Sequence, residues 1–195
     1  MNSLNLAKAA LRKKVKDVIK QITIEERQKQ SKKVFEKLRS LPLFQKSKRV
    51  SIYLSTEDEI DTTQILKYMF DTKKEVFVPT YKGGEMKMVK LLSIEDYEKL
   101  PLTKWNIKQP KFNESRENPL ENGGLDLVVV PGVAFTASGK RLGHGMGYYD
   151  KYLKSCLEKQ QTKPHLIGIA FNEQLRDDVP TSEYDVPMDL VLTEK

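Results

Sequence analysis

A cluster of glycines and basic residues follows a short apolar run, and residue types of this kind can bind an anion. Leu127–Val130 is apolar throughout, predicts a buried strand, and ends at a Pro-Gly pair. The loop after it contains Gly139, Lys140, Arg141, Gly143, Gly145 and Gly147. Glycine lets the backbone approach an anion closely, and the free N–H groups at a helix start favour negative charge. A helix that opens at Tyr148 would complete a phosphate site.

The glycine spacing by itself leaves two interpretations open. Gly143-x-Gly145-x-Gly147 matches neither the dinucleotide fingerprint nor the P-loop. A plain structural loop would account for glycines at alternate positions, whereas the basic pair and the preceding strand favour an anion-binding loop. We therefore predict a phosphate site and keep the structural loop as the alternative.

Composition predicts an ordinary globular protein. The chain has 195 residues, of which 38% are hydrophobic and 31% charged, which suits a single domain over residues 1–195. No apolar run approaches the roughly 18 residues of a membrane helix, so no membrane partner is expected. The single cysteine, Cys156, cannot form an intramolecular disulfide, which suits a reducing compartment, and we expect it to be buried. The expected location is cytoplasmic.

Positive charge is concentrated in the N-terminal quarter. The formal net charge is +7, and the first 50 residues hold 15 lysines and arginines against 4 acidic residues. Such a segment can contact nucleic acid, a membrane surface or an anionic small molecule, or it can be a solvated helix face. Because no nucleic-acid reader motif accompanies it, a basic nucleic-acid-binding module is kept only as the non-enzyme alternative.

The N-terminal hydrophobic pattern predicts two helices. An apolar face at helical spacing is formed by Leu11, Val15, Val18, Ile19 and Ile22. Lys8, Arg12 and Lys16 are expected on another face of this first helix. Thr23 and Glu26 have the spacing of a capping box, which predicts the start of a second helix, with Pro42 just beyond its end.

Strands and helices are expected to alternate along the rest of the chain. The expected strands are Val50–Leu54, Val76–Val78 closed by Pro79, Met86–Leu92, Leu127–Val130, Leu166–Ala170 and Leu190–Leu192. The expected helices start at Asp61 or Thr62, run from a Ser93 cap to near Leu100, and span Tyr149–Gln160. Residues 101–124 predict a long irregular loop, a kind of loop that is often functional. This alternation is typical of an α/β protein whose mostly parallel sheet is covered on both faces.

Several uncommon residues stand in fixed order from Pro131-Gly-x-Ala-Phe135 through Gly139-x-Arg-Leu-Gly-x-Gly-x-Gly-Tyr-Tyr-Asp-x-Tyr-Leu153. This segment resembles the signature of the 5-formyltetrahydrofolate cyclo-ligase family. The resemblance extends to Lys8 with Arg12, Ser51–Ser55 with Asp58–Ile60, Trp105–Ile107 with Gln109–Pro110, Val179–Pro180 and Tyr184–Asp185, and so covers nearly the whole chain. It implies a three-layer αβα fold with a mostly parallel open sheet and a glycine-rich phosphate loop after a central strand.

The resemblance also implies a reaction, the ring closure of 5-formyltetrahydrofolate to 5,10-methenyltetrahydrofolate while ATP becomes ADP and phosphate. A formamide oxygen is a poor leaving group, so its phosphorylation would activate the formyl carbon for attack by N10. Phosphoryl transfer depends on charge neutralisation and positioning. Both ATP and Mg²⁺ are therefore expected at the site.

The resemblance assigns roles to residues of the loop and of the first helix. The ATP-binding residues it implies are Lys8, Arg12, Arg141, Leu142, Gly143, His144, Gly145, Met146, Gly147, Tyr148 and Tyr149. Arg141 and Tyr148 are the implied catalytic residues, and Asp150 and Asp185 the implied Mg²⁺ ligands. Carboxylate oxygens suit Mg²⁺, and a carboxylate such as Asp150 is also favoured in the first turn of a helix.

A folate site is implied on the same loop. Its residues are Leu54, Glu59, His144, Gly145, Met146, Gly147 and Tyr148. Glu59 would accept hydrogen bonds from the pterin, Leu54 would pack on the ring, and Tyr148 would reach the formyl group. His144 and Met146 stand where the family often has glycine or a basic residue, so His144 either carries a proton near phosphate or points into solvent. Trp105 either stacks on folate or packs in the core.

We therefore expect an ATP- and Mg²⁺-dependent ligase of one-carbon metabolism, acting on a reduced folate as a monomer, with no nucleic-acid partner. From the residues alone, the prediction stops at a phosphate-binding α/β protein. A sugar-phosphate isomerase-like protein is the enzyme alternative, because such folds can share a glycine-rich anion loop.

Overall fold

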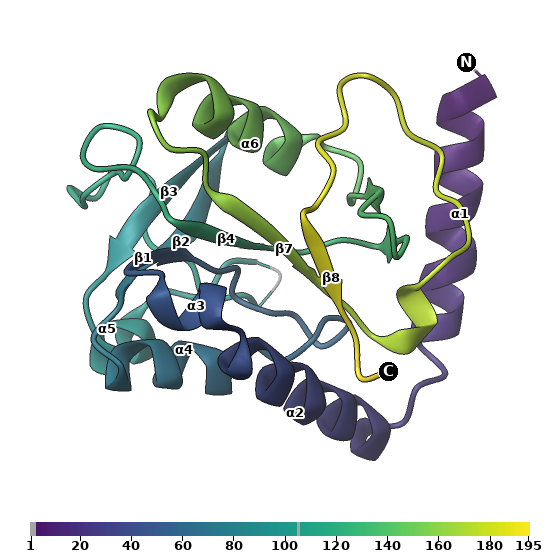
Figure 1. Ribbon diagram of the computed structural model, residues 1–195, viewed down its shortest axis with the longest axis horizontal. Helices are drawn as coiled ribbons and strands as arrows, with labels where there is room; N and C mark the ends of the chain where they lie inside the picture. Colours follow the sequence, from purple (N-terminus) through teal and green to yellow (C-terminus); the bar gives the residue numbers. More distant parts are fainter. Residues whose placement is uncertain (1–2, 105) are drawn as a thin grey trace.

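Six strands form one mixed sheet with helices on both faces (Figure 1). The computed structural model describes residues 3–104 and 106–195. In the order of the sheet, the strands are β3 (Glu85–Leu91), β2 (Glu75–Lys82), β1 (Arg49–Ser51), β4 (Leu127–Val130), β7 (His165–Ile169) and β8 (Leu190–Leu192). Only β3 runs antiparallel to its neighbour. The predicted mostly parallel α/β sheet is confirmed, with an antiparallel strand at one edge.

The helices cover both faces of this sheet. They are α1 (Ser3–Ile19), α2 (Ile24–Ser40), α3 (Pro42–Lys46), α4 (Thr63–Asp71), α5 (Ile94–Lys99) and α6 (Tyr148–Lys159), with a 3₁₀ turn, η1 (Asn172–Gln174). Figure 1 shows α6 on one side of the sheet, α2 to α5 on the other, and α1 standing beside both layers. Strand β4 is buried along its whole length, as expected of a central strand covered on both faces. No helix in residues 3–104 and 106–195 has both the length and the apolarity to span a bilayer.

Helix starts follow the capping residues. The Thr23 side chain accepts a hydrogen bond from the Glu26 backbone N–H at 3.2 Å, and Ser93 accepts one from Asp96 at 3.1 Å, which confirms both predicted caps. Before α4, Asp61 Oδ1 accepts from the Thr63 N–H at 2.9 Å, while the Thr62 side chain makes no cap hydrogen bond. Asp61 therefore supplies the side-chain hydrogen bond at this helix start.

Two prolines lie in elements that the sequence pattern missed. Pro79 lies inside β2 instead of closing it. Pairing between β1 and β2 ends at Ser51↔Phe77, so the N–H group that proline lacks is not needed for pairing with β1 at position 79. Pro42 opens α3, where the missing N–H group costs nothing. The expected strand Val50–Leu54 was too long, since β1 ends at Ser51.

The segment between β4 and α6 is more ordered than the expected loop. It contains a two-stranded hairpin, β5 (Ala134–Phe135) and β6 (Arg141–Leu142). Both residues of β6 are buried. Two-residue strands carry no periodic signal, which is why the sequence pattern did not predict them. Arg141 therefore belongs to a strand and not to a solvated loop.

Helix α1 packs through a small core of its own. This cluster contains Val15, Ile19, Val133, Ala134, Leu142 and Val179. Lys8 and Arg12 lie half-buried on this packed side, whereas Lys16 and Val18 are exposed. The expectation that Lys8 and Arg12 occupy another face is wrong. Lys8 and Arg12 are seven residues before Val15 and Ile19, so the helix places all four on one face. Long basic side chains can bury their aliphatic stems beside apolar residues.

Candidate functional site

The site lies where the order of the sheet reverses. Strands β1 and β4 are parallel neighbours, but the helices after them, α4 and α6, lie on opposite faces of the sheet (Figure 1). The two connecting loops, 52–62 and 131–147, therefore diverge from the carboxyl ends of adjacent strands. In open α/β sheets, ligands bind in the crevice at such a point. The topology thus brings the Glu59 loop and the glycine loop to one place.

The glycine loop has a conformation that needs glycine at two positions. Gly145 has φ +116° and Gly147, the N-cap of α6, has φ +67°, a region that side-chain-bearing residues rarely adopt. His144, before Gly145, is exposed, and Met146, between the two glycines, is 63% exposed. The loop therefore presents its backbone and the start of α6 to solvent, as an anion-binding loop requires.

Glu59 is held so that one carboxylate oxygen faces the glycine loop. Its Oε2 accepts hydrogen bonds from the Thr56 backbone N–H at 2.9 Å and from the Thr56 hydroxyl at 3.1 Å. Its Oε1 lies 3.4 Å from His144 Nε2, and the Glu59 side chain is 12% exposed against 51% for His144. The two loops that the sequence analysis singled out therefore meet, and His144 points toward a carboxylate.

Tyrosines surround this junction. The rings of Tyr81 and Tyr148 lie with centroids 5.1 Å apart, tilted by 56°. Burial raises the pKa of Tyr53, Tyr81 and Tyr149, and the Glu59 carboxylate raises each further. These phenols stay protonated at neutral pH and add no negative charge beside Glu59.

Arg141 lies beneath the glycine loop and is paired with the first turn of α6. Its Nη2 lies 2.8 Å from Asp150 Oδ1, and the two side chains are only 3% and 18% exposed. Its Nη1 donates to the Pro131 carbonyl at 3.2 Å. Asp150 Oδ1 also accepts from the Val186 backbone N–H at 3.0 Å. Asp150 thus joins the glycine loop to the C-terminal segment.

A second ion pair joins α1 to that same segment. Lys8 Nζ lies 2.6 Å from Asp185 Oδ2, which also accepts from the Ser182 N–H at 2.6 Å and the Ser182 hydroxyl at 2.9 Å. Burial opposes ionisation of Asp185, but these hydrogen bonds outweigh it and lower its pKa. Nearby, Arg12 Nε donates to the Gly143 carbonyl at 2.8 Å. Helix α1 therefore holds the glycine loop directly.

The two carboxylates fit a Mg²⁺ ion bound together with phosphate. Within residues 3–104 and 106–195, Asp150 Oδ2 and Asp185 Oδ1 make no hydrogen bond or ion pair. Asp150 accepts a hydrogen bond from the N–H group of Val186, the residue next to Asp185, which brings together the two chain segments that carry these carboxylates. In this part of the chain, no cluster of three or more His, Cys, Asp or Glu side chains could hold a metal ion by itself. Mg²⁺ needs few protein ligands when phosphate and water supply the rest.

Some of the expected site residues face away from the crevice. The Leu142 side chain is 1% exposed in the α1 core, and Tyr149 is 7% exposed in the main core. Leu54 is half-buried against the main core. Leu142 and Tyr149 can therefore contribute backbone or support, but not a side chain reaching ligand. Trp105 lies outside the described residues.

Several neighbours of the site were not found from the sequence. Tyr81 ends near the crevice because β2 continues past Pro79, beyond the expected strand. Thr56 and Ser182 orient Glu59 and Asp185 from three residues away. The spacing of a hydroxyl residue three positions before a carboxylate is a turn signal that could have found both.

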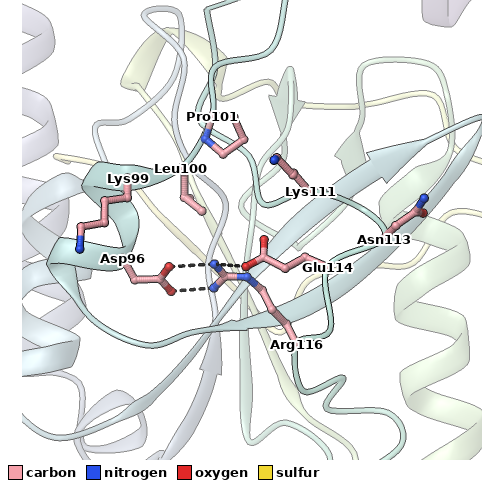
Figure 2. A pocket seen from close by; sticks show the side chains of 8 residues that line it. All are labelled: Asp96, Lys99, Leu100, Pro101, Lys111, Asn113, Glu114 and Arg116. Carbon is pink, nitrogen blue, oxygen red and sulfur yellow. Dashed lines mark hydrogen bonds and ion pairs between the residues drawn. The ribbon is translucent and has the colours of Figure 1, made fainter.

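A separate cavity of about 490 Å³ lies between the end of α5 and the 111–116 segment (Figure 2). Figure 2 shows Arg116 pointing into a double contact with Asp96, with Nη1 and Nη2 at 2.6 and 2.8 Å from the two carboxylate oxygens. Glu114 lies 3.0 Å from the same guanidinium. The charged side chains at the centre of this cavity are paired with one another, and these pairs attach the 111–116 segment to α5. Because the charges already have partners, we do not choose this cavity as the candidate site.

A glycine loop, basic side chains and two carboxylates beyond the carboxyl ends of adjacent parallel strands are typical of the class of α/β proteins that bind anionic ligands beyond the sheet. Residues 5–194 match the model of the 5-formyltetrahydrofolate cyclo-ligase family, and the chain belongs to this family. It is therefore an ATP-dependent ligase of one-carbon metabolism. This confirms the family and the enzyme class that the sequence predicted.

Relatives support this assignment over the full length. The chain is 42% identical to 5-formyltetrahydrofolate cyclo-ligase of Mus musculus, covering 98% of this chain and 96% of that one. It is 39% identical to the probable 5-formyltetrahydrofolate cyclo-ligase of Caenorhabditis elegans, covering 100% and 96%. The solved Aquifex aeolicus 5,10-methenyltetrahydrofolate synthetase superposes with a TM-score of 0.77 at 34% identity, covering 96% and 90%.

The relatives do not agree on a compartment. A 27% identical relative from Arabidopsis thaliana, matched over 99% of this chain and 76% of its own, is named as mitochondrial. The expected cytoplasmic location therefore gains no support from the family.

Proposed function

We propose that this chain closes the ring of 5-formyltetrahydrofolate to give 5,10-methenyltetrahydrofolate, with ADP and phosphate as the other products. The formyl oxygen attacks the γ-phosphorus of ATP, and the bond to the ADP oxygen breaks. N10 then attacks the activated formyl carbon, and the C–O bond breaks to release phosphate while N10 loses its proton. Both steps depend on neutralising phosphate charge and on holding the two substrates in line.

The observation that supports the ATP site most strongly is a set of two ion pairs. Each pair joins an expected phosphate-binding residue to an expected metal ligand. Lys8 is paired with Asp185, and Arg141 with Asp150, at two edges of one glycine loop. Mg²⁺ would supply a positive charge to those carboxylates and to the phosphates together. Lys8 would then be free to turn toward phosphate, while Arg141, almost fully enclosed, would hold Asp150 and support the loop. ATP and Mg²⁺ are thus expected to bind together more tightly than either alone.

The remaining ATP contacts come from the loop itself. Arg12 already reaches the Gly143 carbonyl, and its guanidinium lies 3.6 Å from where a side chain on Gly145 would begin. A side chain at position 145 would touch the guanidinium at ordinary contact distance, so it is the φ of +116° that requires glycine there. We therefore assign phosphate binding to Arg12 and to the backbone of Gly143–Gly147, with the exposed side chains of His144 and Met146 at the rim.

The folate is placed across the junction of the two loops. Glu59 Oε1 would accept from the pterin in place of its contact with His144, and Leu54 would support the ring from the core side. Tyr148 would stand beside the reacting formyl group, with Tyr81 packed against it. The loop positions His144–Gly147 then contact both substrates, which suits a direct phosphoryl transfer between them.

The test is a spectroscopic assay of the purified protein with 5-formyltetrahydrofolate. Methenyl-folate absorbance should grow only when ATP and Mg²⁺ are both present, with one ADP formed per methenyl product. A protein that binds sugar phosphates but forms no methenyl product would instead support the isomerase-like alternative. A monomer in size-exclusion chromatography, cytoplasmic localisation and no salt-dependent nucleic-acid shift are the further expected results.

A further inference from the structure

His144 is the residue of the glycine loop whose side chain can gain or lose a proton near neutral pH. Its Nε2 lies 3.4 Å from Glu59 Oε1, so the imidazole of one loop meets the carboxylate of the other. The His144 side chain is 51% exposed, and its protonation can therefore follow the solvent. Its chain neighbours, Gly143 and Gly145, have no side chains that would hinder its rotation. The contact with Glu59 can thus form and break without a change in the fold.

Glu59 has one oxygen available for a single partner. Its Oε2 accepts hydrogen bonds from the Thr56 backbone N–H and hydroxyl. Among residues 3–104 and 106–195, His144 is the partner recorded at Oε1. The proposed function gives this same oxygen to the pterin. His144 and the pterin therefore compete for it.

The charges around His144 make a proton on it depend on Glu59. From α1, Arg12 Nε donates to the Gly143 carbonyl. From β6, Arg141 Nη1, although its guanidinium is paired with Asp150, lies 3.0 Å from where a side chain on Gly143 would begin. Both guanidinium groups oppose a further positive charge, and the phenols beside the junction are neutral near pH 7. In the part of the chain that the structure describes, Glu59 is the carboxylate recorded in contact with the imidazole.

We propose that His144 is a proton-dependent gate of the folate site, acting through Glu59. The protonated imidazole pairs with Oε1 and competes with the pterin, whereas the neutral imidazole gives up this oxygen and turns toward solvent. The inference rests on the proposed function, which places the pterin at Glu59. Because linkage is reciprocal, a proton that weakens folate binding must be released when folate binds. His144 is thus a positioning residue, which acts on the pterin anchor and not on the reacting atoms.

The decisive experiment is a calorimetric titration of the protein with 5-formyltetrahydrofolate in the absence of ATP, from pH 5.5 to pH 8. An imidazole changes its charge within this range. The wild-type protein should bind about two- to fivefold more tightly at pH 8 than at pH 5.5, the range of an exposed ion pair. Buffers of different ionisation enthalpy should reveal the release of about 0.2 to 0.4 proton per folate near pH 6.5. Added salt should diminish both effects.

His144→Gln keeps a polar side chain at this position but removes the group that titrates. In this variant the proton release should disappear, and so should the two- to fivefold dependence of folate affinity on pH. The matched control is His165→Gln, which removes the other histidine of the chain, an exposed residue at the start of β7. Because β7 is parallel to β4, His165 lies at the end of the sheet opposite to the glycine loop. His165→Gln should release the same fraction of a proton as the wild-type protein.

Equal proton release from the wild-type protein and His144→Gln would overturn the proposal. Proton uptake on folate binding would also overturn it, because the protonated imidazole would then contact the folate itself. Proton release that depends on His144, without any methenyl-folate formation when ATP and Mg²⁺ are added, would support the gate and contradict the proposed reaction. Methenyl-folate formation with proton release that does not depend on His144 would uphold the reaction and overturn the gate.

Discussion

At the scale of single residues, Asp150 has a structural role and a proposed metal role, which one substitution can separate. One of its oxygens is occupied by Arg141 and the Val186 N–H group, and we propose the other as a ligand of Mg²⁺. An asparagine in its place keeps a carbonyl oxygen for the hydrogen bond but loses the charge. The structural and metal roles should therefore respond to different measurements.

Asp150→Asn should lower the apparent Mg²⁺ affinity of turnover by tenfold or more. It should also cost about 1–3 kcal/mol in the free energy of unfolding, because the enclosed Arg141 guanidinium loses its charged partner. Titration of activity with Mg²⁺ and urea denaturation measure the two effects. Asp178→Asn is the control, since Asp178 is paired only with Lys140 and its side chain is 75% exposed. If the Mg²⁺ titration of Asp150→Asn coincides with that of the wild-type protein, Asp150 has a structural role only.

Glu59→Gln tests the folate site in the same way. It replaces an oxygen that would accept from the pterin with an amide that can present a donor, and such mispairing costs about 1–3 kcal/mol. KM for 5-formyltetrahydrofolate should rise by roughly five- to a hundredfold, while ATP binding measured without folate should hardly change. Glu57→Gln in the same loop, at an exposed position, should have little effect on either substrate. Loss of ATP affinity with unchanged folate affinity would show that Glu59 is not the pterin anchor.

At the scale of elements, α1 is the helix that closes the site from the side. Its small core fixes its position, and that position lets Lys8 and Arg12 reach Asp185 and the glycine loop. Lysines on its outer face, such as Lys13, have solvent around them. The basic N-terminal quarter is therefore divided into a half-buried pair at the site and a solvated remainder.

Lys8→Ala should raise KM for ATP by about tenfold or more, because a charge-assisted contact to phosphate is worth about 1.5–3 kcal/mol. The Asp185 carboxylate would also lose its partner, so thermal stability should be checked by circular dichroism at the same time. Lys13→Ala provides the matched loss of one lysine from the exposed face and should leave KM for ATP unchanged. Equal effects of the two substitutions would mean that α1 acts only through its general charge.

At the scale of the whole molecule, the 111–116 segment is tied to α5 by the Asp96–Arg116 pair shown in Figure 2. The hydrogen bonds from Arg116 lower the pKa of Asp96 although burial opposes this. A carboxylate with a lowered pKa stabilises the fold above its unfolded value, about 3.9, and loses that contribution as pH falls through the folded value. Acid should therefore loosen this segment.

Arg116→Leu should lower the free energy of unfolding at pH 7 by about 1–3 kcal/mol. The difference from wild type should shrink below about pH 4, where protonation of Asp96 removes from the wild-type protein the pair that the variant already lacks. Urea denaturation between pH 3 and pH 7 measures this. Lys33→Gln, which removes the exposed pair with Glu36, should cost less than about 1 kcal/mol. A difference that stays constant with pH would assign the loss at Arg116 to packing instead.

The sequence by itself determined the elements with strong local signals. Apolar runs located β4 and β8, hydroxyl residues before α2 and α5 marked their starts, and the alternation of elements predicted a mostly parallel sheet. The order of uncommon residues around Gly143–Gly147 identified the family. These features depend on neighbouring residues or on direct similarity, so no knowledge of the fold was needed.

Only the tertiary structure decided which distant residues meet. The contact of Glu59 with His144, the pairs Lys8–Asp185 and Arg141–Asp150, and the packing of Tyr81 on Tyr148 join segments that the sheet order brings together. The burial of Arg141 and the inward side of α1 also depend on what packs against them. Local patterns carry no information on such partners, because the free energy of these contacts comes from residues far away in the chain.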